Sequence, residues 1–310
     1  MELKTILCPV DFSDQSQQAL RWAIALAARH QSRLIVFTAV DPLLAEAAKT
    51  RLNMDLATTE IDPELRQLVE TTLAPSASWS PPTSFDIKVG HPADMILDAA
   101  GRHHADLIVM GTHGLGGFKK ILLGSTTERV LRRTNTPVLG VPLAKADAVI
   151  LQNSGPRMEL ERILIGTDFS EASTTALEWA AGLARQFGVP LVICHVVPPM
   201  AAPSRWQSHV PDLDEERRRS AQTRLEILAS RFDDTIEYEA VVSTGPPADS
   251  IASIAEGRQA GLIVVGLVGE EGASGHRPGS IAYRLLSLAH VPTLVVPPAT
   301  SVTAQAERQS

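Results

Sequence analysis

The sequence predicts an α/β protein with two tandem domains, each built on a five-stranded, mostly parallel, doubly wound sheet. The first reason is an internal repeat, because Ile6–Ser13 (ILCPVDFS) returns as Ile163–Ser170 (ILIGTDFS). The second reason is that each copy alternates short, β-branched apolar segments with longer segments of helical period. This alternation favours parallel strands joined by right-handed crossovers. Continuous apolar segments of this length are typical of strands that are buried on both faces.

The spacing of the repeat sets the domain boundaries. Asp11 recurs 157 positions later as Asp168, and Gly111 recurs 155 positions later as Gly266, so the copies differ by a net two residues. Each copy has about 150 residues, which is enough to bury its own core. We therefore expect domain 1 at 1–145 and domain 2 at 158–300, joined by a linker at 146–157 that is rich in turn-forming residues.

The elements follow from the period of the apolar residues. In the first copy we expect strands at 5–10, 34–40, 85–89, 107–110 and 138–141, and helices at 13–30, 62–74, 92–103 and 125–134. In the second copy we expect strands at 162–167, 191–197, 236–242, 262–266 and 293–296, and a helix at about 214–231. The pairs Asp62-Pro63 and His91-Pro92 predict helix starts. The segments 50–60 and 198–210 have no clear period and are expected to be loops or short irregular helices.

Composition restricts the class of protein. A hydrophobic content of 44% with 20% charged residues is globular, and the net charge of −7 does not favour nucleic acid binding. Arg217–Arg219 follow four acidic residues and are interpreted as a solvated helix face. Cys8 and Cys194 lie in apolar segments, which predicts buried thiols rather than a disulfide or a metal pair. Without a secretory leader or a long apolar segment, we expect a soluble, cytoplasmic protein that does not contact membranes.

One loop carries the pattern of a phosphate site. Gly111-Thr112-His113-Gly114 follows an apolar strand, and nine residues later Gly124-Ser125 opens a helix. Glycines let the main chain approach a ligand, and free N–H groups at a helix start attract anions. The segment has neither the P-loop motif nor the dinucleotide fingerprint. The spacing alone leaves open a simpler interpretation, in which the loop only leads to a helix capped by Ser125.

Asp11 brings a carboxylate toward this loop. We start from the common strand order 2-1-3-4-5 and renumber its strands by their position in this chain. The first strand, which ends before Asp11, and the fourth, which ends before Gly111, would then be neighbours at a topological switch point. Ligands of open parallel sheets bind at such points. Asp11 could accept hydrogen bonds from a ribose hydroxyl or a base amino group. The alternative is that Asp11 only caps the helix that starts near Ser13.

Several motifs together resemble the universal stress protein family in a tandem form. They are Pro9–Ser13, Gly90-x-Pro92, the Gly111-x-x-Gly114-(nine residues)-Gly124-Ser125 pattern and 137–142 (PVLGVP). The resemblance implies an adenine nucleotide alpha-hydrolase-like fold that binds ATP or a related adenine nucleotide. Mg²⁺ could be bound together with the nucleotide. The implied nucleotide-binding residues are Pro9, Val10, Asp11, Val40, Met110, Gly111, Gly114, Gly124, Ser125 and Thr126. Family members commonly pair through the last strand, so the two halves are expected to form a pseudo-dimer, and a homodimer of whole chains stays open.

The second copy predicts a weaker site. Its residues are Thr167, Asp168, Val197, Gly266, Gly269, Gly279 and Ser280. The nine intervening residues carry a formal charge of +2 in the first copy, from Lys119 and Lys120, and −1 in the second. One charge about 6 Å from a phosphate at an effective dielectric constant near 20 is worth roughly 3 kcal/mol before screening. The nucleotide is therefore expected chiefly in domain 1.

The sequence favours a stress-response protein that uses nucleotide binding as a regulatory switch, through ordering of the loop between Gly111 and Gly124. Little or no catalysis is expected, since no base stands ready to activate water, and weak ATP hydrolysis is the most that we expect. No metal site is expected, because His103 and His104 are adjacent and point to different faces of a helix. The competing hypothesis is a nucleotide-independent scaffold for a protein partner that the sequence does not identify.

Overall fold

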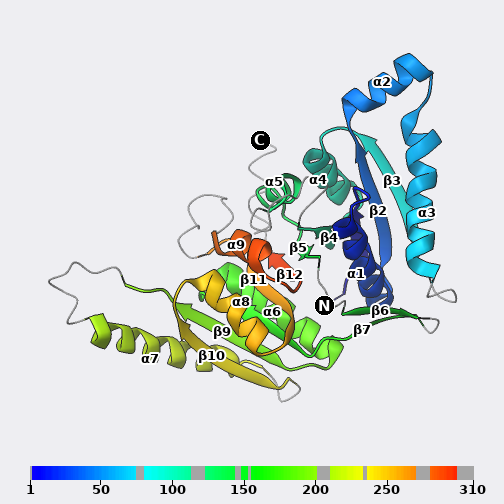
Figure 1. The fold of residues 1–310 in the computed structure, drawn as a ribbon. Helices are drawn as coiled ribbons and strands as arrows, with labels where there is room; N and C mark the ends of the chain where they lie inside the picture. Colours follow the sequence, from blue (N-terminus) through cyan, green and yellow to red (C-terminus); the bar gives the residue numbers. More distant parts are fainter. Residues whose placement is uncertain are drawn as a thin grey trace, which may run out of the picture. The chain divides into compact units, whose positions relative to one another are not determined.

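The structure is a computed structural model that describes residues 2–74, 80–112, 123–143, 148–152, 155–200, 210–232, 236–269 and 280–298. It divides into two compact units at Glu159 and Leu160, with the short segment Ala289–Thr293 grouped with the first unit. Each unit contains a central sheet with helices packed against it (Figure 1). The predicted α/β fold class is confirmed.

The first unit has helices on both faces of its sheet. Helix α1 packs on β1 and β4 and contacts α3, whereas α4 packs on β1 and β2 and contacts α5 (Figure 1). These two helix layers bury β1 and β5 completely, and they leave the edge strand β3 half exposed. The elements are β1 (Thr5–Pro9), α1 (Asp14–His30), β2 (Arg33–Val40), α2 (Pro42–Leu52), the π-helix η1 (Ala57–Ile61), α3 (Asp62–Leu73), β3 (Thr83–Val89), α4 (Pro92–Arg102), β4 (Leu107–Gly111), α5 (Ser125–Leu131), β5 (Val138–Val141), β6 (Val149–Gln152) and β7 (Gly155–Met158).

The strand order in this unit is β3-β2-β1-β4-β5, and the neighbouring strands are parallel. The order differs from the expected 2-1-3-4-5, because the chain first adds β2 and β3 on one side of β1. It then returns to place β4 and β5 on the other side. The predicted neighbourhood of the first and fourth strands is nevertheless confirmed, since Ile6 pairs with Leu107 and Leu7 with Ile108. The switch point therefore lies between β1 and β4.

The second unit repeats this arrangement with the order β10-β9-β8-β11-β12. Helix α6 packs on β8 and β11, α7 packs on β9 and β10, and α8 contacts α9. The elements are β8 (Arg162–Gly166), α6 (Glu171–Phe187), β9 (Leu191–Val197), α7 (Val210–Ala229), β10 (Tyr238–Thr244), α8 (Pro247–Gly257), β11 (Ala260–Gly266), α9 (Ser280–Leu288) and β12 (Thr293–Val296).

Helix α2 has no counterpart among the predicted elements. It begins after Asp41, whose carboxylate accepts from the N–H groups of Leu43 and Leu44, with Pro42 in the first turn. Leu43 is 77% exposed and Leu52 is 69% exposed, so the leucines do not form a buried stripe. The helix is thus specified by its cap and not by an apolar face.

The segment 50–60, expected to be a loop or an irregular helix, contains the end of α2 and most of η1. The π-helix continues directly into α3, because Ile61 and Asp62 both have right-handed helical backbone angles. Asp62 therefore does not cap α3, and that prediction was wrong. Its carboxylate instead bonds Arg66 one turn later, at 2.8 Å. At the other predicted start, His91 does precede Pro92 as the extended cap residue of α4.

The segment 146–157, expected to be a linker, contributes to a short antiparallel hairpin formed by β6 and β7. The hairpin contacts α1 in the first unit, and Arg21 of α1 donates to the carbonyl of Val149 at 3.0 Å. Val149 is 1% exposed, whereas the next residue, Ile150, is 39% exposed. One side of this hairpin is therefore part of the first unit's core.

The cores of the two units contain the two cysteines. Cys8 and Cys194 are both buried free thiols, as predicted. Burial raises the pKa of both thiols, that of Cys194 to about 12. Trp22 is buried, and its counterpart Trp179 in the second copy is half-buried.

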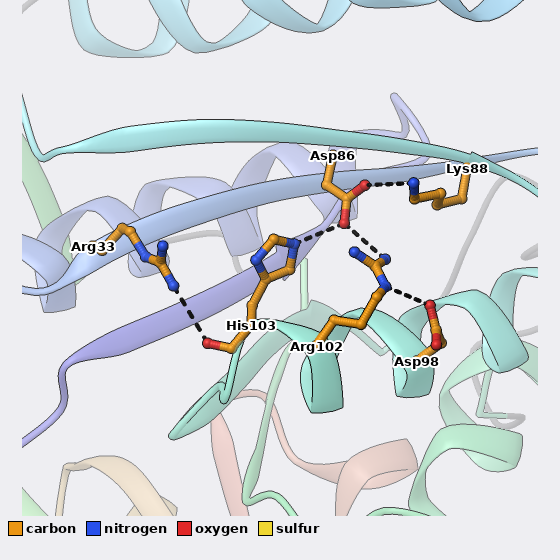
Figure 2. Close-up of polar contacts among 6 residues, drawn as sticks. All are labelled: Arg33, Asp86, Lys88, Asp98, Arg102 and His103. Carbon is orange, nitrogen blue, oxygen red and sulfur yellow. Dashed lines mark hydrogen bonds and ion pairs between the residues drawn. The ribbon is translucent and has the colours of Figure 1, made fainter.

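A cluster of charged residues fixes the edge strand β3 to the end of α4 (Figure 2). Asp86 of β3 accepts from Nε2 of His103 at 2.8 Å and from Arg102 at 2.9 Å. Burial of the Asp86 carboxyl opposes its ionisation, but the hydrogen bonds from His103 and Arg102 outweigh burial and lower its pKa below the ordinary value. His103 is also the cap residue at the end of α4.

Within the residues that the structure describes, no helix has both the length and the apolar character that a membrane span requires. In the same ranges, no group of three or more His, Cys, Asp or Glu residues is arranged to hold a metal ion.

Candidate functional site

The candidate site of the first unit lies where β1 and β4 end side by side. The register pairs Ile6 with Leu107, which places Asp11 and Thr112 at the same level, just beyond the two strand ends. Neighbouring strands lie about 4.8 Å apart. The predicted carboxylate and the start of the glycine loop are therefore brought to the same edge of the sheet.

Asp11 is exposed and takes part in the start of α1. Its Oδ1 accepts from the backbone N–H of Ser13 at 3.1 Å and from the Ser13 hydroxyl at 2.5 Å. Ser13 is itself the N-cap of α1, accepting from the N–H of Ser16. Within the described residues no hydrogen bond engages Oδ2 of Asp11, so Asp11 supports the cap and still presents one carboxylate oxygen to solvent.

The residue after Asp11 has an unusual backbone. Phe12 has a φ of 63°, and its counterpart Phe169 has a φ of 64°. Bulky residues rarely adopt this left-handed conformation, which costs about 1 kcal/mol or more. The turn after Asp11 therefore keeps its left-handed residue in both copies, although this conformation costs conformational free energy.

The β2 side of the site is built from buried backbone. The N–H of Val10 donates to the carbonyl of Phe37 at 2.8 Å, and the hydroxyl of Thr38 donates to the carbonyl of Val10 at 2.9 Å. The carbonyl of Val40 accepts from Gly90 at 3.0 Å. The side chains of Pro9, Val10, Val40 and Met110 are buried, so a ligand at these strand ends would meet mainly their backbone atoms.

The β4 side is closed by hydrogen bonds between the ends of the glycine loop. The N–H of Gly124 donates to the carbonyl of Thr112 at 2.8 Å, and the hydroxyl of Thr127 donates to the carbonyl of Gly111 at 3.0 Å. Ser125 is exposed and Thr126 half-buried at the start of α5. Gly114 and the rest of 113–122 lie outside the described residues.

Packing requires a glycine at position 111. A Cβ on Gly111 would lie 3.0 Å from Cβ of Gln15 and 3.1 Å from its carbonyl carbon. The counterpart Gly266 meets the backbone of Ala172 at 3.0 Å in the same way. Both glycines allow the first turn of a helix to approach the end of a strand, a reason that the glycine spacing did not reveal.

In the second unit Asp168 repeats the cap of Asp11. Its Oδ1 accepts from the N–H of Ser170 at 3.0 Å and from the Ser170 hydroxyl at 2.6 Å. A Cβ on Gly269 would lie 2.8 Å from Oδ2 of Asp168, so the carboxylate and the start of the second glycine loop are in direct proximity. Gly279 lies outside the described residues, and Ser280 begins α9.

The two sites differ at a residue that sequence reasoning missed. His195 lies on β9 at the position of Thr38 on β2, and its Nδ1 is 2.8 Å from the carbonyl of Thr167. Because a carbonyl oxygen can only accept, Nδ1 carries the proton. Burial and the charge of Arg224 lower the pKa of His195, although its bond to Thr167 acts in the opposite direction. The sequence signal was available, since strand registers align His195 with Thr38, but it required aligning the two copies residue by residue.

The residues of the first site fit an adenine nucleotide in the chemistry of their exposed groups. Asp11 offers an acceptor for hydroxyl or amino groups, the β1 and β2 ends offer backbone atoms, and Ser125 and Thr126 offer hydroxyl donors. Val40 ends β2 and Thr112 follows β4, so a ligand at this edge of the sheet would touch segments that are far apart in sequence. This arrangement can bind and orient a nucleotide.

Comparisons with known proteins agree with the fold and the repeat. A profile of the Universal stress protein family matches residues 2–142 and again residues 159–297. A universal stress protein of Mycolicibacterium smegmatis (strain ATCC 700084 / mc(2)155) is 28% identical over 306 residues, which cover 94% of this chain and 97% of that protein. One from Methanocaldococcus jannaschii is 31% identical over 144 residues, 46% of this chain and 85% of that protein.

A solved structure supports the same architecture over the whole chain. The crystal structure of a universal stress protein from Archaeoglobus fulgidus DSM 4304 has a TM-score of 0.64 at 22% identity. The match covers 96% of this chain and 98% of that one, and it shows a shared fold. Since the family profile matches both halves, the chain belongs to the universal stress protein family, as a member with two tandem domains.

Proposed function

We propose that this protein binds ATP or a related adenine nucleotide, chiefly in its first domain, and that occupancy acts as a regulatory switch in a stress response. The observation that carries the proposal is the convergence of Asp11 with the start of the glycine loop at one edge of the sheet. The crevice at a switch point is where open parallel sheets bind ligands. Membership of the universal stress protein family supports the same ligand class and the link to stress.

The roles follow from the chemistry of each group. The free Oδ2 of Asp11 accepts from the ribose or the base, and the backbone near Val40 lies against the adenosine. Gly111, Gly124, Ser125 and Thr126 serve the phosphates, and a Mg²⁺ ion, if it accompanies ATP, is held by the phosphates and water.

Binding rather than turnover is the proposed activity. The carboxylate of Asp11 is engaged with Ser13 through one oxygen, which orients the side chain for hydrogen bonding. In a switch of this kind, the nucleotide shifts the population of conformations that a partner protein recognises. The shift can be no larger than the difference in affinity between the two conformations.

The test is the variant Asp11→Asn. An amide keeps the side-chain oxygen that accepts from Ser13, so α1 stays capped, but it loses the negative charge and one acceptor. A lost hydrogen bond to a charged group costs about 1.5–3 kcal/mol, which is roughly 10- to 100-fold in affinity. Isothermal titration of ATP into the full chain should show this loss.

The matched control is Asp14→Asn, which removes the same charge three residues away, from an exposed position in the first turn of α1. It should leave the affinity for ATP close to that of the wild type. Equal affinity in wild type and Asp11→Asn would contradict the proposal. If the wild type binds no adenine nucleotide, and none is released from purified protein, a nucleotide-independent scaffold becomes the better description.

A further inference from the structure

A groove with a volume of about 370 Å³ lies between helix α8 and the edge strand β10 of the second unit. This volume falls in the range of small-molecule sites, about 300–1,000 Å³. One face of α8 and its C-terminal cap residue contribute Asp249, Ser250, Ser253, Ile254, Gly257 and Arg258, and β10 contributes Ser243. None of these residues belongs to the candidate nucleotide site, so the groove is a separate feature of this unit.

The groove is open because the second copy has small side chains where the first has long ones. The repeat and the strand registers align Lys88, Met95, Asp98 and Arg102 with Ser243, Ser250, Ser253 and Gly257. In the first unit, Arg102 bonds both Asp98 and Asp86 across the equivalent space (Figure 2). A Cβ on Gly257 would meet no atom within 4 Å, so the backbone there could carry a side chain.

The charged groups at the two ends of the groove are already paired. Asp249 accepts two hydrogen bonds from Arg284, each at 2.8 Å. Arg258 donates to both carboxylate oxygens of Glu239, with the shortest contact at 2.7 Å. A charged ligand would have to compete with these charge-assisted hydrogen bonds, so the groove favours an uncharged one.

The middle of the groove offers hydroxyl groups beside one apolar side chain, Ile254. Among the residues that the structure describes, no hydrogen bond engages the hydroxyl of Ser243, Ser250 or Ser253. A serine hydroxyl both donates and accepts, so it matches ligand groups that do the same, as other hydroxyls do. The groove has the volume of roughly a dozen water molecules, at ~30 Å³ each, which is close to that of a small sugar alcohol.

We propose that this groove binds a small, uncharged polyhydroxyl compound, of the size of a sugar alcohol or a monosaccharide. Ser243, Ser250 and Ser253 supply the hydrogen bonds, and Ile254 contacts the C–H groups of the ligand. The first domain does not share this site, because charged side chains occupy the equivalent space. The proposal goes beyond nucleotide binding and does not depend on it.

Capture of disulfide probes by an introduced thiol measures which class of compound the groove prefers. The chain has two cysteines, both buried, so Ser253→Cys adds one accessible thiol at an exposed position. Three probes with the same linker are compared at a fixed concentration of 2-mercaptoethanol: a gluconamide, which is an uncharged polyol, a succinamate, which is anionic, and a butanamide, which is apolar. Intact-protein mass spectrometry gives the captured fraction of each at equilibrium.

The gluconamide should be captured at Ser253→Cys about fivefold more strongly than the other two probes, which corresponds to one net hydrogen bond. The matched control is Glu256→Cys, on an exposed position of the same helix that does not line the groove. There the three probes should be captured equally. A second control adds Gly257→Met to Ser253→Cys, because an uncharged side chain at this position fills the groove, and the preference for the gluconamide should disappear.

Equal capture of the three probes at Ser253→Cys would overturn the proposal, as would a preference for the succinamate or the butanamide. A gluconamide preference that also appears at Glu256→Cys, or that persists with Gly257→Met, would arise outside the groove and would overturn it as well. None of these measurements involves a nucleotide, so their failure is distinct from a failure of the proposed function, which Asp11→Asn tests.

Discussion

Gln31 ends α1 in a left-handed conformation, with a φ of 56°, and its N–H group bonds the carbonyl of Ala27. The equivalent residue at the end of α6 is Gly188, with a φ of 66° and no atom within 4 Å of the position of a Cβ. Left-handed conformations are costly for residues with a Cβ and cheap for glycine. The second copy therefore uses the residue that this cap favours, and the first copy does not.

The variant Gln31→Gly should stabilise the end of α1 by about 0.5–1 kcal/mol, because the relief at positive φ exceeds the larger chain entropy of glycine. Gly188→Ala should destabilise the end of α6 by a similar amount. Hydrogen exchange of the last turn of each helix, followed by mass spectrometry, measures both effects. Faster exchange in Gln31→Gly than in the wild type would contradict this account.

The contribution of Asp86 to stability should depend on pH. Its pKa is lowered in the folded state, against an ordinary value of 3.8. A group with a depressed folded pKa contributes stability above its unfolded pKa and loses it as pH falls toward the folded value. Asp86→Asn should therefore cost about 1–2 kcal/mol near pH 7, given the half-exposed partners, and this cost should shrink below about pH 4.

Urea-induced unfolding followed by circular dichroism between pH 7 and pH 3 measures this cost. The control is Asp98→Asn, because Asp98 bonds Arg102 alone at 2.6 Å and is 52% exposed (Figure 2). It should change stability much less. A cost of Asp86→Asn that stays the same across the whole pH range would show that the carboxylate charge is not its cause.

At the scale of elements, a helix or strand was predictable where the spacing of its apolar residues matches the spacing of its buried positions. The buried residues of α1 recur four positions apart, as in Leu20 with Ile24 and Ala23 with Ala27, which is the helical period, so both its type and its length were predicted. Helix α2 could not be found in this way, since its leucines face solvent. Local capping specifies it, and capping is a weaker sequence signal than an apolar stripe.

The hairpin of β6 and β7 shows a second reason for failure. The residues at 153–156 (NSGP) favour a turn, and a turn fits a linker as well as a hairpin. Only the packing of Val149 against the first unit separates the two, and packing is a tertiary property. The same applies to the site, because the position of Asp11 was predicted from its strand, whereas the contact of Arg224 with the Phe169 ring depends on how α7 packs, which is a tertiary property.

The hairpin should depend on the side of β6 that is buried. Val149→Asn places an amide at a position that is 1% exposed and should loosen the hairpin by about 2–3 kcal/mol, through lost apolar burial and an unsatisfied polar group. Ile150→Asn changes the adjacent residue, which is 39% exposed, and should have a small effect. Limited proteolysis within 146–158 measures the difference, and equal cleavage of both variants would argue against packing on α1.

At the scale of the whole molecule, the two copies share a fold but differ in the side chains at equivalent positions. Strand and helix registers align the charged cluster of Figure 2 with smaller residues in the second unit. Lys88, Asp98 and Arg102 correspond to Ser243, Ser253 and Gly257. These three residues line a cavity of about 370 Å³ beside α8. The second copy keeps one ion pair here, since Arg258 at the position of His103 pairs with Glu239 at 2.7 Å, but the smaller residues beside it leave a pocket where the first copy has charged side chains.

The same divergence predicts an unequal response to nucleotide. A ligand that binds only the folded form of a domain stabilises it by RT ln(1 + [L]/Kd), about 2.7 kcal/mol at 100 times Kd. Amides that exchange only on global opening should then slow by roughly 100-fold. We expect this for β1, β2 and β4 in the presence of ATP, and little change for β8, β9 and β11.

Hydrogen exchange with mass spectrometry resolves the two units, because their peptides differ in sequence. Asp11→Asn should remove the protection of the first unit at the same ATP concentration, which separates site binding from nonspecific effects of a polyanion. Equal slowing of both units in the wild type would mean either that both sites bind or that the units open together. Either result would contradict a switch that acts chiefly through the first domain, because the free energy of binding must appear where the nucleotide is bound.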